Sequence, residues 1–202
     1  MCKLLLVRHG NTKLNSAERF WGQTDVELSA RGIEQAELLR DRLSAQPIDS
    51  VYTSNLRRAR VTAEIIASRH QVEVTSCTEL GEIDFGQAEG LTFQEIGRRY
   101  PEVAESMASW STQSRFPGGE GPEELNGRVR KFLPRLERHG PDETILIVAH
   151  AGTLRMLICN LLGLELGYWR RIRLDLASLS ILETYPRGEV LSLLNDVSHL
   201  ES

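Results

Sequence analysis

The sequence has few cysteines and no arrangement that would use them structurally. Cys2, Cys77 and Cys159 are widely separated and form no Cys-x-x-Cys motif, which argues against a disulfide framework and a structural zinc site. No apolar run approaches the length of a membrane span, and the apolar residues near the N-terminus are too few for a signal peptide. We therefore expect a cytoplasmic protein without a membrane partner.

The chain also lacks an excess of basic charge. It has 24 Lys and Arg against 28 Asp and Glu, for a formal net charge of −4, which argues against nonspecific binding to nucleic acid. No Gly-x-x-x-x-Gly-Lys-Ser/Thr loop is present, so nothing indicates a P-loop nucleotide site. The absence of a Gly-x-Ser-x-Gly elbow disfavours a Ser-His-Asp hydrolase.

The most informative stretch that is present lies close to the N-terminus. Residues 4–7 are an apolar run that ends abruptly at Arg8, His9 and Gly10. Such a run is typical of a buried, parallel strand, and open α/β sheets bind ligands at the carboxyl ends of their strands. A histidine beside a guanidinium at that position indicates an oxyanion site, with phosphate as the expected ligand.

Strand and helix patterns alternate along the rest of the chain. Strands are predicted at 4–7, 49–53, 71–75 and 144–149, and helices at 29–43, 56–69, 122–139 and 153–162. This alternation predicts a mostly parallel sheet with right-handed crossovers, and the length of 202 residues fits one domain, 1–202. Pro134 should kink or end its helix. Residues 176–183 and 189–194 predict a terminal antiparallel hairpin, and residues 176–183 are the expected edge strand for pairing in a possible homodimer.

Residues 83–124 interrupt this alternation. They contain short helical patterns at 93–99 and 102–110, followed by a Pro- and Gly-rich stretch at 117–122. We interpret the segment as a helical insertion that covers the sheet edge and shapes a substrate pocket.

Three predicted strands end in polar groups that would share one rim of a parallel sheet. The strand at 4–7 is followed by Arg8 and His9, the strand at 49–53 by Ser54, and the strand at 144–149 by His150. Arg57 and Arg58 fall in the first turn of the helix after Ser54, where the helix N-terminus also favours an anion. Two histidines, arginines and helix amides together suit the spreading negative charge of a phosphoryl group.

A neutral histidine can itself attack phosphorus, and the leaving alkoxide then needs a proton from a carboxylic acid. Glu82 is the best-placed acid in the sequence, with Asp84 in reserve. Ser54 is better explained as a helix cap than as a nucleophile, and only one of the clustered arginines need act. A metal site is disfavoured because no carboxylate–histidine spacing supports it.

Six motifs in order resemble the histidine phosphatase superfamily, the phosphoglycerate mutase-like proteins. They are Leu-Val-Arg-His-Gly-Asn-Thr-x-x-Asn (6–15), Leu-Ser-x-x-Gly-x-x-Gln-Ala (28–36), Tyr-Thr-Ser-x-Leu-x-Arg-Ala-x-x-Thr-Ala (52–63), Glu-Ile-Asp-Phe-Gly-x-x-Glu-Gly (82–90), Pro-Gly-Gly-Glu (117–120) and Val-Ala-His-Ala-Gly (148–152). The resemblance covers nearly the whole chain. It implies a three-layer α/β/α sandwich, whose mixed sheet has one antiparallel edge strand, and no metal or organic cofactor.

The resemblance also implies a role for individual residues. His9 would be the phosphorylated nucleophile, and Glu82 would be the proton donor to the leaving group. The implied phosphate ligands are Arg8, Arg58, His150, Asn15 and a backbone amide of Ala151 or Gly152. Arg58 is thereby preferred to Arg57.

Within the superfamily, the chain departs from the cofactor-dependent mutases. Those proteins carry Glu-Arg-His-Tyr-Gly where this sequence has Glu-Ile-Asp-Phe-Gly at 82–86, and they are longer, so hydrolysis is favoured. The insertion and the hairpin resemble those of alpha-ribazole phosphatases of cobalamin biosynthesis. That resemblance predicts a small phosphorylated metabolite, alpha-ribazole 5′-phosphate, as substrate, with Trp21 or Trp110 flanking its base. The alternatives are a broad sugar-phosphate phosphatase, a phosphoglycerate mutase and a non-catalytic phosphoryl-binding module.

Overall fold

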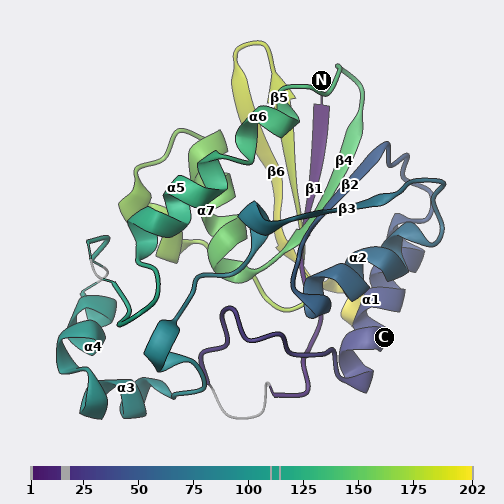
Figure 1. Ribbon diagram of the computed structural model, residues 1–202. Helices are drawn as coiled ribbons and strands as arrows, with labels where there is room; N and C mark the ends of the chain where they lie inside the picture. Colours follow the sequence, from purple (N-terminus) through teal and green to yellow (C-terminus); the bar gives the residue numbers. More distant parts are fainter. Residues whose placement is uncertain (1, 15–18, 110, 114, 202) are drawn as a thin grey trace.

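A mixed, mostly parallel sheet forms the centre of the molecule (Figure 1). The computed structural model describes residues 2–14, 19–109, 111–113 and 115–201. Within them, six strands pair in the order β3-β2-β4-β1-β5-β6. Their bounds are β1 Cys2–Arg8, β2 Ser50–Ser54, β3 Val74–Cys77, β4 Thr144–Ala149, β5 Leu179–Tyr185 and β6 Gly188–Asp196. Strands β1 to β4 are parallel, and β5 runs antiparallel to both β1 and β6.

Helices cover both faces of this sheet, which gives the three layers that the resemblance implied (Figure 1). The side chains of β1 alternate, so that Leu5 and Val7 face one side and Leu4 and Leu6 face the other. The first side packs against α1 (Ala30–Leu43) and α2 (Arg57–Ala67). The second packs against α5 (Pro122–Arg130) and α7 (Ala151–Leu161).

Local sequence signals explain most of the helix boundaries. Ser29 caps α1 by accepting a hydrogen bond from the amide of Gly32. The helix expected at 122–139 is divided into α5 and the short α6 (Leu133–Leu136), because Pro134 has no amide hydrogen to continue the hydrogen-bond ladder.

Two predicted boundaries are displaced. Strand β3 begins at Val74 rather than residue 71, because its parallel register with β2 aligns Val51 with Val74 and Ser54 with Cys77. Helix α7 begins at Ala151 rather than Thr153, so His150 occupies its N-cap position. The first backbone amides of α7 therefore lie next to His150.

The terminal hairpin is present as predicted, and it forms one side of the sheet with antiparallel pairing. Strand β5 is bonded on both sides, to β1 and to β6. The outermost strand is therefore β6, and pairing with a second copy at this side would involve β6 rather than residues 176–183.

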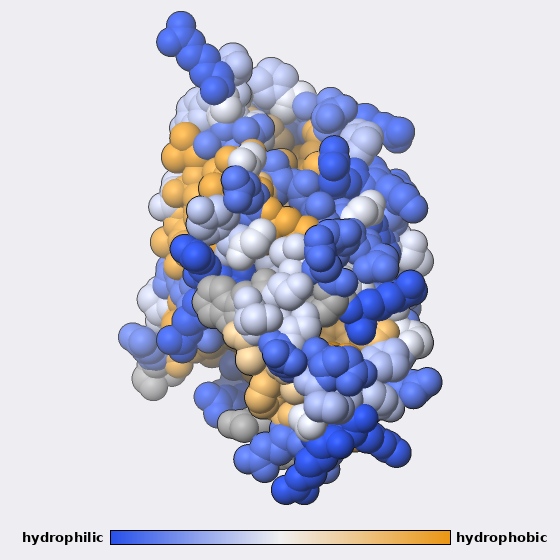
Figure 2. Space-filling view, turned by 90° about the vertical axis from the view of Figure 1, so that its left-hand side faces the viewer, coloured by the Kyte–Doolittle hydropathy of each residue, from blue (hydrophilic) through white to orange (hydrophobic). Residues whose placement is uncertain are grey.

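The insertion contains α3 (Phe93–Arg99) and α4 (Pro101–Ala108). It lies beyond the carboxyl ends of the strands rather than along a sheet edge (Figure 1), because Ile96, Val103 and Phe116 join the apolar core on the α5–α7 side. The face of the molecule in Figure 2 is mostly hydrophilic, with apolar atoms gathered in patches. Among the described residues, every helix is too short or too polar to span a bilayer.

Candidate active site

The parallel strands bring the predicted residues to one rim of the sheet. Arg8 ends β1, Ser54 ends β2, and His150 directly follows β4. Strands β1 and β4 stay paired up to this rim, where the amide of His9 donates to the carbonyl of Ala149 at 3.0 Å. The rings of His9 and His150 consequently meet edge to face, with centroids 5.0 Å apart.

His9 is held as a neutral imidazole whose Nε2 has no hydrogen-bond partner among the described residues. Its Nδ1 lies 2.8 Å from the carbonyl oxygen of Gly10, and a carbonyl can only accept, so Nδ1 carries the proton. Burial, followed by the positive charges of Arg58 and Arg8, holds the pKa of His9 well below its ordinary value. The Nε2 lone pair of His9 is therefore available at neutral pH.

The loop that carries His9 is fixed by close backbone packing. A Cβ added to Gly10 would lie 2.5 Å from the carbonyl oxygen of Gly32 at the start of α1, so the two segments meet only because both residues are glycines. The amide of Gly10 also donates to Thr62 in α2. These contacts set the direction in which the His9 ring projects.

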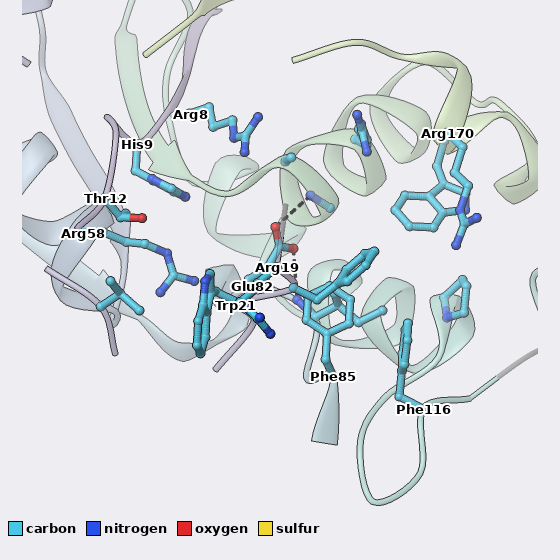
Figure 3. Close-up of a pocket in the computed structure, with 18 of the residues that line it drawn as sticks. Arg8, His9, Thr12, Arg19, Trp21, Arg58, Glu82, Phe85, Phe116 and Arg170 are labelled. Atoms are coloured by element: carbon cyan, nitrogen blue, oxygen red, sulfur yellow. Dashed lines mark hydrogen bonds between the residues drawn. The ribbon is translucent and has the colours of Figure 1, made fainter. Parts of the chain in front are cut away.

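Two guanidinium groups flank His9, that of Arg58 buried and that of Arg8 partly buried. Arg8 donates to the carbonyl of Leu174 at 2.6 Å, and Arg58 donates to the carbonyls of Gly22 and Thr24 at 2.6 and 2.8 Å. Burial lowers the pKa of both groups, and nearby Glu82 opposes that shift, but arginine stays charged throughout. Both lie beside His9 at the cavity wall (Figure 3).

Arg57 lies outside this group. Its side chain is exposed and forms a 2.7 Å ion pair with Glu27. The preference for Arg58 over Arg57 therefore agrees with the positions of the two side chains.

The position of Arg58 depends on a residue that the sequence reasoning did not single out. Glu89 accepts hydrogen bonds from the amides of Gly22 and Gln23 and from the hydroxyl of Thr24. It thereby orders the loop whose carbonyls accept from Arg58. The available signal was the second glutamate of the Glu-Ile-Asp-Phe-Gly-x-x-Glu-Gly motif.

His150 is fully buried, and Ser54 orients it. The hydroxyl of Ser54 lies 2.8 Å from Nε2 of His150 and accepts from the amide of Leu56 at 3.2 Å. Nδ1 of His150 is buried without a hydrogen-bond partner among the described residues. Burial, Arg58 and His9 hold the pKa of His150 well below its ordinary value, so this ring is also neutral.

Glu82 lines the same cavity as His9. Its Oε1 accepts from the amide of Ile83 at 3.0 Å, and its Oε2 accepts from the amide of Gly152 at 3.1 Å. Because Glu82 occupies the amide of Gly152, the amide of Ala151 is the one left for a phosphoryl oxygen. Asp84 does not line the cavity and bonds the amide of Gly86 instead.

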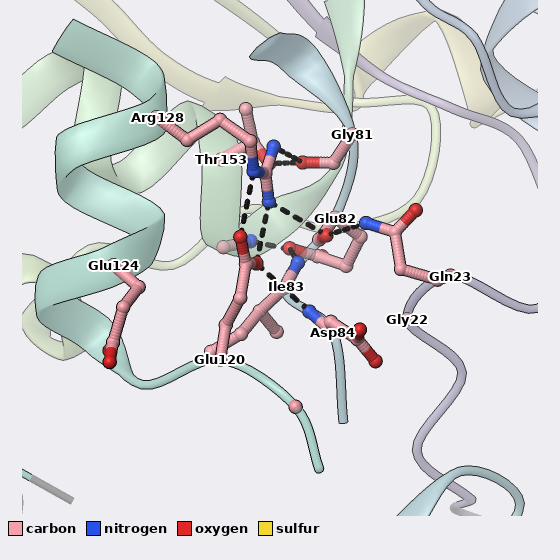
Figure 4. A network of polar contacts seen from close by, with 12 residues as sticks. Gly22, Gln23, Gly81, Glu82, Ile83, Asp84, Glu120, Glu124, Arg128 and Thr153 are labelled. Atoms are coloured by element: carbon pink, nitrogen blue, oxygen red, sulfur yellow. Dashed lines mark hydrogen bonds and ion pairs between the residues drawn. The ribbon is translucent and has the colours of Figure 1, made fainter. Parts of the chain in front are cut away.

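Arg128 holds the segment around Glu82 in place (Figure 4). It donates to the carbonyls of Gly81 and Glu82 at 2.8 and 3.0 Å and pairs with Glu120 at 2.8 Å. Glu120 also accepts from the amide of Asp84. The Pro-Gly-Gly-Glu motif therefore acts through Arg128 and Glu120 on the backbone that carries Glu82.

Arg8, His9, Arg58 and Glu82 line a cavity of about 500 Å³, whereas the fully buried His150 is not among its lining residues. Its aromatic wall is continuous, since Phe85 packs edge to face on both Phe20 and Phe116, with centroids 5.2 and 4.9 Å apart. Trp21 also lines the cavity, beside Arg58 (Figure 3), and donates to the carbonyl of Leu14.

Two residues of the sequence prediction are not placed. Asn15 and Trp110 lie outside the described residues. Their expected contacts with phosphate and with a substrate base stay predictions.

Comparison with known proteins identifies the family. The family model of the histidine phosphatase superfamily (branch 1) matches residues 4–197. The chain belongs to the histidine phosphatase superfamily. The match confirms the resemblance drawn from the six motifs.

Individual relatives within the histidine phosphatase superfamily carry different names. Phosphoserine phosphatase 1 of Hydrogenobacter thermophilus is 34% identical over 200 residues, covering 99% of this chain and 95% of the relative. A Serratia proteamaculans protein named "Probable phosphoglycerate mutase" is 35% identical over 207 residues, covering 100% and 96%. The crystal structure of alpha-ribazole phosphatase from Shigella flexneri superposes with a TM-score of 0.88 at 32% identity, covering 96% of both chains. The three names describe different activities, so membership of the superfamily does not by itself specify a substrate.

The charges of this histidine phosphatase site suit an anion. Among the residues described, no group of three or more His, Cys, Asp and Glu side chains is placed to hold a metal ion. Both histidines have guanidinium groups as their charged neighbours, and these repel a cation and attract a phosphoryl group. Sequence reasoning also missed three further cavity arginines, Arg19, Arg155 and Arg170.

Proposed function

We propose that this protein hydrolyses small phosphomonoesters through a phosphohistidine formed on His9. One observation carries the proposal: a neutral imidazole, whose Nε2 has no hydrogen-bond partner among the described residues, shares one cavity with two guanidinium groups and a carboxyl group. Glu82 is the one carboxyl side chain among the described residues that line this cavity. Family membership and the phosphatase relatives support the same chemistry.

In the first step, the Nε2 lone pair of His9 forms a bond to phosphorus. The phosphorus–oxygen bond to the alcohol breaks, and Glu82 delivers a proton to the leaving oxygen. Arg8 and Arg58 stabilise the charge on the phosphoryl oxygens as they pass through the transition state. The hydrogen bond from Nδ1 of His9 to Gly10 stabilises the positive charge that develops on the ring.

In the second step, water attacks the phosphohistidine. Glu82, now a carboxylate, takes a proton from that water while the nitrogen–phosphorus bond breaks. Inorganic phosphate leaves, and both His9 and Glu82 return to their starting states. His9 therefore forms the bond to phosphorus in the first step and is released in the second, while Glu82 first donates a proton and then accepts one.

His150 supplies a hydrogen-bond donor in this scheme. The hydroxyl of Ser54 already accepts from the amide of Leu56, and among the described residues its own hydrogen has Nε2 of His150 as its acceptor. The proton of the neutral ring then lies on Nδ1. A buried donor without a partner costs about 1–3 kcal/mol, and a phosphoryl oxygen bound beside His9 would remove that cost.

Two classes of alcohol suit the cavity. Alpha-ribazole 5′-phosphate, an intermediate of cobalamin biosynthesis, is supported by the resemblance of the insertion, by the Shigella flexneri structure and by the aromatic wall. Trp21 would flank its base, and Trp21→Ala should then raise KM for this substrate. A phosphorylated acid is the second class, favoured by Arg155 and Arg170, which line the same cavity, and by the phosphoserine phosphatase relative.

The test is phosphate release in EDTA, without a bisphosphoglycerate primer. The panel would hold alpha-ribazole 5′-phosphate, phosphoserine, 3-phosphoglycerate, fructose phosphates and p-nitrophenyl phosphate. We expect His9→Ala to lose at least about 1,000-fold in kcat/KM on every substrate. Arg58→Gln should lose about 100-fold, whereas the matched control Arg57→Gln, one residue away and ion-paired to Glu27, should stay near wild type.

The intermediate can be trapped by acid-free quenching with a ³²P-labelled substrate. Wild-type protein should carry a label that is stable in alkali and lost in acid, and His9→Ala should carry none. Turnover by His9→Ala at the wild-type rate would refute the mechanism. Phosphate transfer to a second glycerate without release would instead support a mutase.

A further inference from the structure

Two further guanidinium groups line the cavity, and one of them, Arg155, is near enough to Arg8 and Glu82 for their charges to act on one another. Arg155 projects from α7, and Arg170 lies in the 3-10 segment Leu166–Arg171. In Figure 3, Arg170 lies across the cavity from His9 and Arg58, with Phe85 between them. The cavity therefore has positive charge at both ends and an aromatic wall along its length.

Among the described residues, neither arginine forms an ion pair with a carboxylate, although the charges of Glu82 and Asp175 act on Arg155 from a longer distance. Arg155 donates from Nε to the carbonyl of Ile172 at 2.7 Å, which fixes its stem, and its two terminal nitrogens have no hydrogen-bond acceptor in the part of the chain that the structure describes. Arg170 donates to the carbonyl of Met107 and lies over the ring of Trp169, 5.1 Å from its centroid. Burial and the charge of Arg155 both lower the pKa of Arg170, so the two groups repel each other.

Arg19 provides an internal comparison. It lines the same cavity, but Glu95 neutralises it at 2.8 Å and the carbonyl of Gly90 accepts from it as well. The protein thus pairs one cavity arginine with its own carboxylate and leaves two others, partly buried and close together, without one. Partly buried charges are usually paired, so the missing partner is expected to arrive with a ligand.

We infer that Arg155 and Arg170 form a second subsite, which binds a carboxylate on the alcohol part of the substrate. The inference rests on the proposed phosphatase function and narrows its substrate class to phosphorylated hydroxy acids or amino acids. A carboxylate presents two oxygens in one plane, which matches the fork of a guanidinium group. It also carries a single charge, so placing it among aromatic rings costs less than placing a second phosphate there.

The subsite would make the enzyme distinguish substrates that carry a carboxylate from substrates that lack one. A substrate without the carboxylate leaves two partly buried guanidinium groups unpaired, and such a loss is penalised more strongly than the loss of an apolar group. Nucleoside phosphates, whose alcohol part is uncharged, would fill the aromatic wall but leave these arginines unpartnered.

The experiment compares phosphoserine with phosphoethanolamine, which differ by the carboxylate alone. We expect wild-type kcat/KM to favour phosphoserine by about 30- to 100-fold. Arg155→Gln and Arg170→Gln should each reduce that ratio to below about fivefold, and Arg155→Lys should restore part of it because the charge remains. The control Arg19→Gln, whose side chain is neutralised within the protein, should change the ratio less than threefold.

The outcomes separate this inference from the proposed function. If no substrate, including p-nitrophenyl phosphate, releases phosphate in a His9-dependent manner, the proposed function itself fails. If phosphate is released but phosphoserine and phosphoethanolamine react equally, or alpha-ribazole 5′-phosphate exceeds both by 100-fold, the carboxylate subsite is refuted and the phosphatase stands. Should Arg155→Gln fail to fold, the ratio in Arg170→Gln decides alone.

Discussion

Replacing Gly152 with alanine tests how the proposed proton donor is held. A Cβ at this position would lie 2.4 Å from Oε1 of Glu82 and 3.4 Å from Leu125. Since carbon–oxygen contacts are ordinarily about 3.3–3.6 Å, the carboxyl group must move by about 1 Å. It then also loses its hydrogen bond from the amide of residue 152, now 3.1 Å long.

The expected cost follows from the role of Glu82. A general acid contributes about 100- to 10,000-fold, and a displacement of about 1 Å can remove about 100-fold. We expect Gly152→Ala to lower kcat on phosphoserine by about 100-fold. The loss on p-nitrophenyl phosphate should be smaller, because p-nitrophenolate leaves without a proton.

Two controls show whether the effect passes through Glu82. In a Glu82→Gln background, Gly152→Ala should add little, because the two changes affect one interaction. Gly127→Ala in α5, where an added Cβ meets nothing within 4 Å, should keep wild-type activity and gain about 0.5–1 kcal/mol in stability. Wild-type kcat in Gly152→Ala, or a full 100-fold loss in the Glu82→Gln background, would refute the reasoning.

Three further predictions follow from buried polar contacts. Glu89→Gln loosens the loop that positions Arg58, so kcat/KM should fall about 10- to 100-fold; an unchanged value in steady-state assays would show that Arg58 holds its position alone. Ser54→Ala should lower kcat more than it raises KM, and Ser54→Thr should restore most of the loss, whereas equal kcat in all three proteins would contradict a role in orienting His150. His9 and His150 have folded-state pKa values well below 6.5, so as pH falls below about 6.5 the unfolded chain binds protons that the folded chain does not. The free energy of unfolding should therefore fall by up to about 1.4 kcal/mol per pH unit for each histidine, and urea titrations at pH 7 and 5.5 should show a smaller fall in His150→Gln.

The residues of the site that lie at strand ends could be predicted from sequence alone. Arg8 and His9 follow an apolar run, and His150 follows another. A buried parallel strand must end in residues at the shared rim, so the meeting of these side chains follows from local pattern and topology alone. The capped start of α1 and the break at Pro134 are equally local, because one residue's hydrogen-bonding capacity decides each.

The groups that support the site could not be predicted in this way, because they come together only when distant segments fold onto one another. Glu82 bonds an amide 70 positions away, and Glu89 orders a loop 65 to 67 positions away. Neither contact has a periodic signature, because loops carry no repeating constraint on which residues meet. The starts of β3 and α7 depended likewise on pairing and packing with distant segments.

Arg155 and Arg170 are a second example of a feature that only the folded chain reveals. Arg155 sits in a helical pattern and Arg170 in a run of basic residues that reads as a solvated face. Their common cavity exists only because the insertion brings Met107 and Phe116 over the ends of the strands. Whether a charged side chain has a partner depends on the residues that folding brings near it, whereas the positions of Arg8, His9 and His150 follow from the strands that precede them.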